Sequence, residues 1–418
     1  MENAYIYLNS LGLHKIKPGL GRIKKLVESL GNPQDKAPGI IVGGTNGKGS
    51  AAAAISSVLR AGGWNTGAYT SPHLINVTER IKIDGAEIDG SDLAKLILRV
   101  KKAAEKSRAG SPSYFEVLTA AAFLYFDECG VDFSVLEVGM GGRWDATNVI
   151  TPLVSVITNV SKDHTEYLGN TIGEIASEKA RIIKPGVPAV TGASGRALGV
   201  IEEYAARHNS PLKVYGRDFS SRGESTDDFG YTGSVWKLRG LRSNLRGLYQ
   251  IENLSVAIAA LEALSEYHGI EIREKDLRRG LLGIDWRGRL EILREDPPLI
   301  LDSAHNPGGA RALVKSLEKM YPSLKFTFLI GMLVDKDHSR FIRELTPLAR
   351  KFIVTEIESE RAIGAKALAK KVSRIFPGAV RTEKDFRKAY KDLLNEDKPA
   401  CIAGSLYLTG EVEGLRRP

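Results

Sequence analysis

The sequence predicts an α/β protein made of two successive domains, each built on a parallel sheet. Short apolar runs rich in β-branched residues alternate with stretches that have helical spacing. Strands buried on both faces form continuous apolar runs because helices cover both sides of a parallel sheet. This alternation restarts after a Pro-Pro segment at 294–298, which we interpret as the linker. We therefore expect domains at residues 1–293 and 294–418.

The expected elements follow one another in βα order. In the first domain the patterns predict helices at 20–30, 91–106 and 116–127, strands at 132–138 and 154–159, and a hairpin or loop at 220–233. In the second domain they predict strands at 299–301, 326–330, 352–354 and 400–403, with helices at 337–351, 362–375 and 384–394.

Composition narrows the class of protein. A chain of 418 residues with 43% hydrophobic and 26% charged residues is long enough for two globular cores. The net charge of +9 is spread among acidic residues without a basic block, so we expect no nucleic-acid partner. No apolar run reaches the roughly 18 residues of a membrane span, and no signal peptide is recognised. Cys129 and Cys401 make no disulfide framework, so we expect a cytoplasmic protein.

The most informative segment is 40–50, in which the apolar run Ile40–Val42 leads into G-G-T-N-G-K-G-S and an alanine-rich tract. Glycines let backbone N–H groups converge on an anion, and a helix N-terminus and a lysine add positive charge. The candidate ligands of a nucleoside triphosphate are Asn46, Gly47, Lys48, Gly49 and Ser50. The Ser50 hydroxyl stands where a Mg²⁺ ligand is expected. The alternative is a plain tight turn before a surface helix.

Polar residues after other strands are the next candidates, because ligands of open α/β sheets bind at the carboxyl ends of the strands. Glu137 ends an apolar run and is a candidate Mg²⁺ ligand, with a solvated charge as the alternative. His164 and Ser71 also follow predicted strands. His164 is equally well interpreted as a structural histidine, and Ser71, which precedes a proline, is by itself better interpreted as a turn residue. Lys179 precedes a Pro-Gly helix stop, and by its residue type alone it is best interpreted as a solvated lysine.

The second domain opens with its own candidates. The segment 302–309, D-S-A-H-N-P-G-G, follows a strand and begins a helix, which is a natural place for ribose or phosphate contacts. Arg289, in W-R-G-R-L-E just before the linker, has the planar guanidinium that clamps phosphates. A surface ion pair is the alternative for this arginine.

Together these motifs resemble the folylpolyglutamate synthase and dihydrofolate synthase branch of the Mur ligase family. The matching segments run from end to end of the chain: G-T-N-G-K-G-S (44–50), T-S-P-H-L (70–74), E-V-G-M-G-G-R-W-D-A-T-N-V (137–149), D-H-T-E-Y-L-G (163–169), E-K-A-R-I-I-K-P-G (178–186), R-G-R-L-E (287–291), A-H-N-P (304–307) and G-S-L-Y-L-T-G-E-V (404–412). The resemblance implies a P-loop-type parallel-sheet ATPase domain followed by a smaller Rossmann-like α/β domain.

The resemblance implies an ATP-dependent amide ligase that adds L-glutamate to dihydropteroate or reduced folates through an acyl phosphate. It implies two Mg²⁺ sites, with Ser50, Ser71 and Glu137 as ligands of one and His164 and a carbamylated Lys179 at the other. Lys48, Lys179, His164 and Arg289 would be catalytic, and Asn253, Arg289, Asp302 and His305 would contact ATP.

The resemblance also implies where the pterin carboxylate or folate binds. The residues concerned are Ile16, Lys17, Pro18, Gly19, Ser113, Tyr114, Phe115, Glu116, Trp144, Asp145 and Ala146. Aromatic rings among them are suited to stacking on a flat heterocycle. We expect a monomer whose partners are small molecules. A Mur-type ligase with another acceptor, such as a non-folate pterin, is the first alternative, and a P-loop ATPase that drives a partner's conformation is the second.

Overall fold

The computed structural model describes residues 2–13, 15, 17–107 and 110–416. The chain divides into two compact units. Unit 1 takes in residues 1–223, 227–244 and 252–285, and unit 2 takes in residues 224–226, 245–251 and 286–418. The expected boundary after residue 293 falls inside strand β12 (Glu291–Arg294), and the structure divides the chain earlier, between residues 285 and 286.

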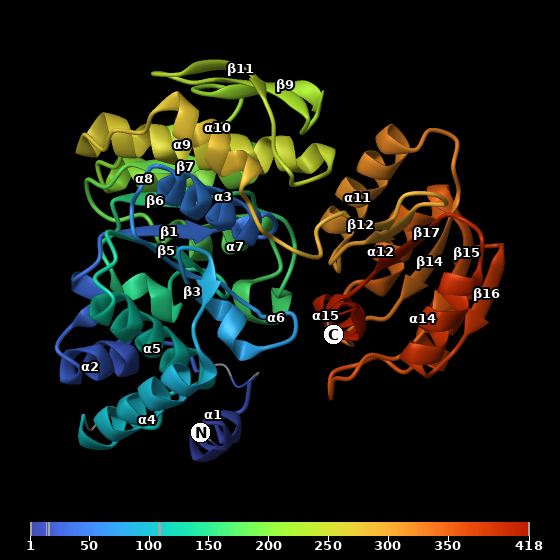
Figure 1. The fold of residues 1–418 in the computed structure, drawn as a ribbon, viewed down its shortest axis with the longest axis horizontal. Helices are drawn as coiled ribbons and strands as arrows, with labels where there is room; N and C mark the ends of the chain where they lie inside the picture. The colour runs from blue at the N-terminus through green and yellow to red at the C-terminus, as the bar shows by residue number, and fades with distance from the viewer. Residues whose placement is uncertain (1, 14, 16, 108–109, 417–418) are drawn as a thin grey trace. The chain divides into compact units, whose positions relative to one another are not determined.

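The large sheet of unit 1 contains β1 (Gly39–Gly43), β2 (Thr66–Tyr69), β3 (Ile81–Ile83), β4 (Ala86–Glu87), β5 (Phe133–Glu137), β6 (Val154–Ile157), β7 (Ala189–Thr191) and β8 (Leu212–Val214). Its order is β4-β3-β2-β5-β1-β6-β7-β8 (Figure 1). Strands β2, β5, β1, β6, β7 and β8 are parallel, and β3 and β4 form an antiparallel edge. Both β1 and β5 are buried throughout, which explains why most of their residues are apolar.

Helices cover both faces of this sheet. They are α1 (Glu2–Ser10), α2 (Gly21–Ser29), α3 (Lys48–Ala61), α4 (Gly90–Lys106), α5 (Tyr114–Glu128), α6 (Thr165–Leu168), α7 (Ile172–Ala180), α8 (Gly195–Arg207), α9 (Leu248–His268) and α10 (Glu274–Leu282), with short 3₁₀ turns η1 (Pro33–Asp35), η2 (Val77–Arg80) and η3 (Ala146–Val149). Helices α1, α2, α4 and α5 lie together (Figure 1) and share one core with Ile41 and Leu136 of the sheet. The helices expected at 20–30, 91–106 and 116–127 are thus confirmed as α2, α4 and α5.

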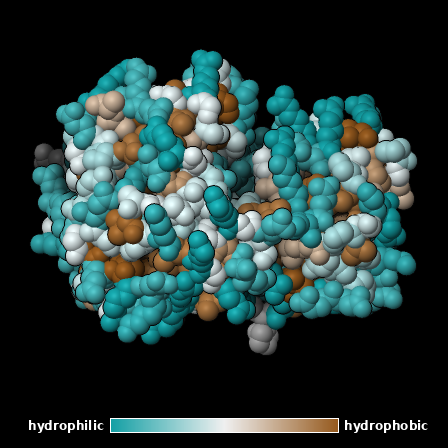
Figure 2. Space-filling model, turned by 90° about the horizontal axis from the view of Figure 1, so that it is seen from above, coloured by the Kyte–Doolittle hydropathy of each residue, from teal (hydrophilic) through white to brown (hydrophobic). Residues whose placement is uncertain are grey.

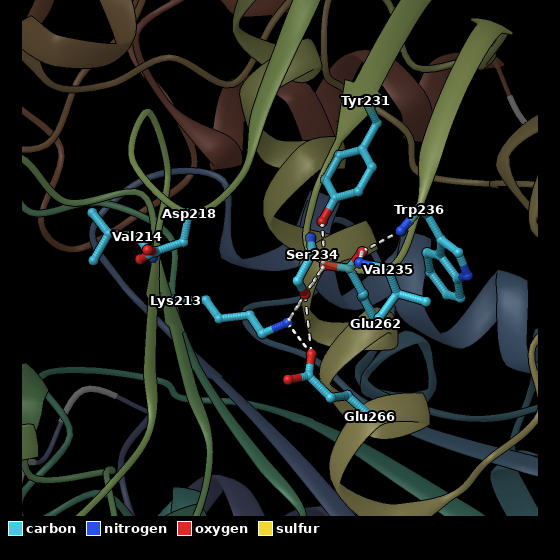
Figure 3. Close-up of polar contacts among 9 residues, drawn as sticks. All are labelled: Lys213, Val214, Asp218, Tyr231, Ser234, Val235, Trp236, Glu262 and Glu266. Carbon is cyan, nitrogen blue, oxygen red and sulfur yellow. Dashed lines mark hydrogen bonds and ion pairs between the residues drawn. The ribbon is translucent and has the colours of Figure 1, made fainter.

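A second, three-stranded sheet is formed by β9 (Ser220–Ser225), β10 (Asp228–Thr232) and β11 (Lys237–Leu241), where a hairpin or loop was expected. A carboxylate of α9, Glu262, holds the β10–β11 turn (Figure 3). Its fully buried oxygens accept backbone N–H groups of Val235 at 2.8 Å and Trp236 at 2.7 Å, and the Tyr231 hydroxyl at 3.0 Å. Lys213 balances the charge at 3.6 Å, so this buried carboxylate is both paired and hydrogen-bonded.

Unit 2 contains β12, β13 (Leu299–Leu301), β14 (Phe326–Ile330), β15 (Ala349–Val354), β16 (Ala379–Thr382) and β17 (Ala400–Ala403), with helices α11 (Pro307–Met320), α12 (His338–Leu345), α13 (Ala365–Ser373), α14 (Phe386–Asn395) and α15 (Leu406–Arg416) and the turn η4 (Thr346–Leu348). The sheet order is β12-β13-β17-β14-β15-β16, parallel except for β12. The expected Rossmann-like α/β arrangement is confirmed by these parallel strands and their crossover helices.

Two expectations for this region were wrong. The supposed linker 294–298 is the turn between β12 and β13, because these two strands pair in antiparallel fashion in the same sheet. The helix expected at 337–351 ends at Leu345, and the chain enters β15 at Ala349. Pro347 explains the difference, since proline cannot continue a helix.

The visible surface is mostly polar. The face in Figure 2 is dominated by hydrophilic residues, and its apolar residues form small separate groups. Within the part of the chain that the structure describes, no helix has both the length and the apolar character needed to cross a bilayer.

Candidate active site

The phosphate-loop candidate lies between β1 and α3, as the sequence predicts. Gly44 and Gly47 adopt φ values of +134° and +81°, a region that glycine enters without a steric penalty. A Cβ on Gly44 would lie 2.0 Å from the Thr158 hydroxyl oxygen, so the backbone also needs glycine to approach β6 this closely. Helix α3 begins at Lys48 and therefore directs its first N–H groups toward the loop.

The end of β6 braces this loop, which our sequence interpretation missed. The N–H groups of Thr45 and Asn46 donate to the carbonyl and side-chain oxygens of Asn159 at 2.9 and 3.0 Å. The Thr158 hydroxyl donates to the Asn46 carbonyl at 2.7 Å. Because β6 pairs directly with β1, polar residues just after β6 could have been predicted to contact the loop that follows β1. The N–H groups of residues 45 and 46 are therefore engaged within the chain, whereas a first helical turn such as that of α3 has N–H groups without intrahelical partners.

Two lysines converge on the loop. The Lys48 amine donates to the Thr45 carbonyl at 3.2 Å, and the Lys179 amine, from the last turn of α7, donates to the Gly44 carbonyl at 2.7 Å. Lys179 is only 4% exposed, so the solvated-surface interpretation of this residue is wrong. Burial, followed by the positive charge of Lys48, lowers the pKa of Lys179 to about 7.

Oxygen donors gather at the ends of the strands beside the loop. Glu137 ends β5, where it pairs in register with Val42 of β1, and its carboxylate accepts the Ser71 N–H at 3.1 Å. Ser71 follows β2, the other neighbour of β5. Ser50 lies in the first turn of α3 and is 2% exposed. The structure thus brings the predicted ligands Ser50, Ser71 and Glu137 to the carboxyl ends of neighbouring parallel strands.

His164 lies in a different setting. It is exposed, adopts φ of +50°, and precedes α6. Among the residues that the structure describes, no group of three or more histidine, cysteine, aspartate or glutamate side chains is arranged to hold a metal. The predicted second metal position at His164 and Lys179 therefore stays a prediction.

The expected acceptor segments lie together at the start of α5. The Lys17 amine donates to the Ser111 carbonyl at 2.8 Å, and Arg22 forms an ion pair with Glu116 at 3.3 Å. Ser113 and Glu116 form a capping box that begins α5. Their buried side chains therefore fix the position at which α5 begins. Pro18 is exposed and Gly19 is half-buried beside Lys17, whereas Ile16 lies outside the described residues.

The third acceptor segment also reaches α5. A Cβ on Gly139 would lie 2.9 Å from the Phe115 ring and 3.3 Å from an Asp145 oxygen, so these residues share one corner. Asp145 accepts the N–H groups of Met140 and Thr147, both at 3.0 Å, and burial raises its pKa. Ala146 is buried in the turn that follows.

The aromatic candidates differ in exposure. Tyr114 is 5% exposed, and the Arg80 guanidinium lies 5.6 Å from its ring centroid. Trp144 is 47% exposed, with Arg143 at 4.4 Å over one face. Trp144 rather than Tyr114 therefore presents an accessible ring for stacking, because Tyr114 belongs to the core of unit 1.

Asn253, on α9, lies against the phosphate loop. A Cβ on Gly47 would lie 2.1 Å from its side-chain oxygen, so this amide touches the loop directly. The sequence separation of these two residues gave no hint of this contact. The structure therefore brings the predicted nucleotide contact Asn253 beside the predicted phosphate cradle.

In unit 2, Asp302 follows β13 and is 4% exposed. Its oxygens accept the N–H groups of Leu290 and Ala304, both at 2.8 Å, and the Tyr249 hydroxyl at 3.0 Å. Burial raises the pKa of Asp302, while the charge of nearby Arg289 opposes the shift. His305 Nδ1 donates to the Ser303 carbonyl at 3.0 Å, just before α11 begins. The charge of Arg289 thus acts on Asp302, and His305 follows Asp302 by three residues along the chain.

Both units match known domains. Residues 42–261 match the Mur ligase middle domain, and residues 288–406 match the Mur ligase glutamate ligase domain. The chain belongs to the Mur ligase family. A dihydrofolate synthase/folylpolyglutamate synthase of Bacillus subtilis is 36% identical over 95% of this chain and 94% of its own length.

Solved structures of the family agree with the fold. The folylpolyglutamate synthase of Mycobacterium tuberculosis, complexed with ADP and AMPPCP, gives a TM-score of 0.90 at 32% identity, covering 99% of this chain and 97% of its own. The bifunctional folylpolyglutamate synthase/dihydrofolate synthase of Yersinia pestis, complexed with AMPPNP and Mn ion, gives a TM-score of 0.90 at 29% identity. The match again covers 99% of this chain and 97% of that chain. The predicted fold and the predicted function, an ATP-dependent ligase of the folylpolyglutamate and dihydrofolate synthase group, are confirmed.

Proposed function

We propose that this ligase joins L-glutamate to dihydropteroate, to a reduced folate, or to both, through an acyl phosphate. The observation that carries the proposal is the contact of Glu137 with Ser71 at the carboxyl ends of β5 and β2, next to β1, which leads into the loop that holds Lys48. Phosphoryl transfer to a carboxylate brings anions together, so catalysis depends on positioning and on neutralising charge. A phosphate loop beside hard oxygen donors provides both.

The candidate residues of unit 1 bind the phosphates or Mg²⁺ in this proposal. The N–H groups of α3's first turn and the Lys48 amine bind the phosphates and stabilise the charge that develops on them. Ser50, Ser71 and Glu137 are oxygen donors, which is the ligand type that Mg²⁺ prefers, so the residues present fit this ion. When bound, Mg²⁺ supplies further positive charge at the phosphates.

We propose that Lys179 carries a carbamate. Carbamylation needs the neutral amine, whose nitrogen attacks CO₂ and loses one proton to give an anionic N-carboxylate. A pKa lowered to about 7 makes the neutral amine available near neutral pH. The product replaces a cation by an anion beside the loop, which suits a second divalent ion near His164. The supporting observation is that this lysine is buried and directed at the loop rather than at solvent.

The remaining predicted residues bind the two larger substrates. Lys17, Pro18, Gly19, Phe115 and Trp144 are proposed to hold the acceptor, together with Ile16, Ser113, Tyr114, Glu116, Asp145 and Ala146. Asn253, and in unit 2 Arg289, Asp302 and His305, are proposed to contact the nucleotide. A monomeric state and a cytoplasmic location stay predictions, and light scattering in solution tests the first.

One experiment tests the reaction. The protein is incubated with ATP, Mg²⁺ and glutamate, and receives dihydropteroate, tetrahydrofolate or a non-folate pterin carboxylate in separate reactions. Mass spectrometry should find one added glutamyl unit on dihydropteroate, on tetrahydrofolate, or on both, with one ADP formed per unit. Addition to the non-folate pterin alone would favour the alternative acceptor. A rate of ATP consumption that is the same with and without each acceptor and glutamate would contradict the proposal.

A further inference from the structure

Unit 2 contains a phenol–carboxylate pair that the resemblance does not explain. Tyr249 lies in the first turn of α9, and its hydroxyl donates to Asp302 Oδ2 at 3.0 Å. The partly buried Tyr249 ring packs on the core of unit 2. Burial raises the pKa of Tyr249 well above its ordinary value, and the neighbouring Asp302 charge adds to this. The phenol is therefore a permanent hydrogen-bond donor to this carboxylate.

Asp302 in turn holds the turn that follows Arg289. The same Oδ2 accepts the Leu290 N–H at 2.8 Å, and Leu290 adopts φ of +49°. A left-handed conformation costs a branched residue about 1–2 kcal/mol, so the surrounding contacts must hold it in place. The Leu290 side chain is fully buried in the core of unit 2.

Residues 247–249 brace this turn from the other side. Gly247 has φ of +105°, and a Cβ there would lie 2.9 Å from the Tyr249 ring and 3.2 Å from the Leu290 side chain. The Leu248 N–H donates to the Ser316 hydroxyl at 3.0 Å, which ties the segment to α11. Tyr249 is thus fixed independently of the carboxylate that it contacts.

Within the described part of the chain, the hydrogen bonds to Asp302 leave one acceptor position of its carboxylate for a ligand. An ionised carboxylate offers about four acceptor positions. Three are used inside the chain, by Leu290, Ala304 and Tyr249. The positive charge of Arg289 lowers the pKa of both Tyr249 and Asp302 and so opposes the effect of their burial. A rotated Asp302 would lose contacts to the turn and to any ligand at once.

We propose that Tyr249 is a positioning residue for nucleotide binding, which acts by fixing the Asp302 carboxylate and, through it, the Arg289–Leu290 turn. This inference rests on the proposed function of Asp302 and Arg289 as nucleotide contacts. Tyr249 itself touches no substrate in this proposal. Its loss should weaken ATP binding without changing affinity for glutamate or the acceptor.

The test compares Tyr249→Phe with Tyr321→Phe in the full-length protein. Tyr321 packs against the same core of unit 2, so its variant controls for the loss of a phenol hydroxyl. The Kd for AMPPCP is measured by calorimetry, and KM values are measured for ATP, glutamate and acceptor. Because a hydrogen bond to a charged group is lost, the Tyr249 variant should raise Kd and KM for ATP about tenfold. The Tyr321 variant should leave them unchanged.

Three outcomes separate the possibilities. Weaker ATP binding, with wild-type KM for glutamate and an unfolding midpoint close to wild type, supports the positioning role. Lower stability with an unchanged Kd for AMPPCP overturns it and leaves Tyr249 a structural residue. Failure of the wild-type protein to bind AMPPCP would instead overturn the proposed function on which the inference depends.

Discussion

Replacing Lys179 by methionine tests the buried amine directly through the pH dependence of stability. The pKa of Lys179 is about 7 in the folded protein, against the ordinary lysine value of 10.5 that applies to the unfolded chain. Between these values the unfolded chain binds more protons, so stability rises with pH through this window. Below about pH 7 both states hold the proton, and the contribution of this lysine no longer changes.

The expected magnitude follows from the two pKa values. From pH 7 to pH 9, loss of the Lys179 proton stabilises the folded state by RT multiplied by the natural logarithm of about 50, which is about 2 kcal/mol. The lysine of the unfolded chain stays protonated over the same interval. Wild-type protein should therefore gain about 2 kcal/mol over that interval relative to Lys179→Met, because the variant keeps all other titrating groups. The sign is opposite to that of a lysine stabilised by an ion pair.

The assay is urea unfolding at pH 7 and pH 9, followed by tryptophan fluorescence in buffers freed of CO₂ so that the amine stays unmodified. Lys162→Met is the matched control, since the Lys162 side chain is exposed. It should follow the wild type at both pH values. If Lys179→Met also follows the wild type, the amine is not buried in its neutral form, and the argument for carbamylation loses its support.

Three further substitutions test the chemistry. Lys48→Ala should lower ligation by at least about 100-fold, because a charge that opposes the developing anion is lost, and near-normal glutamyl product by mass spectrometry would refute the loop assignment. Lys179→Ala should be badly impaired and partly rescued by added acetate, whereas full activity without rescue would leave the lysine without a catalytic role. Glu137→Gln should shift the Mg²⁺ activation curve to concentrations at least about tenfold higher, and an unshifted curve would remove Glu137 from the metal ligands.

Local sequence determined the elements that first locate the site. The β-branched run, the glycines of 43–49 and the alanine-rich tract predict a strand, an anion-binding turn and a helix because each depends on neighbouring residues only. Glu137 at the end of an apolar run was recognised for the same reason. The resemblance then supplied the partners that no local pattern reveals.

Tertiary structure alone decided which of these residues meet. The pairing of β1 with both β5 and β6 brings Glu137 and the Thr158–Asn159 brace to the loop. Packing also turned Lys179 from an expected surface lysine into a buried amine, and it made Tyr114 a core residue. The contacts of Asn253 with Gly47, and of Tyr249 with Asp302, join distant segments. Periodicity and spacing depend on residues that are near one another in the sequence. Burial and strand order depend on contacts between distant segments, which form only when the helices pack on the assembled sheet.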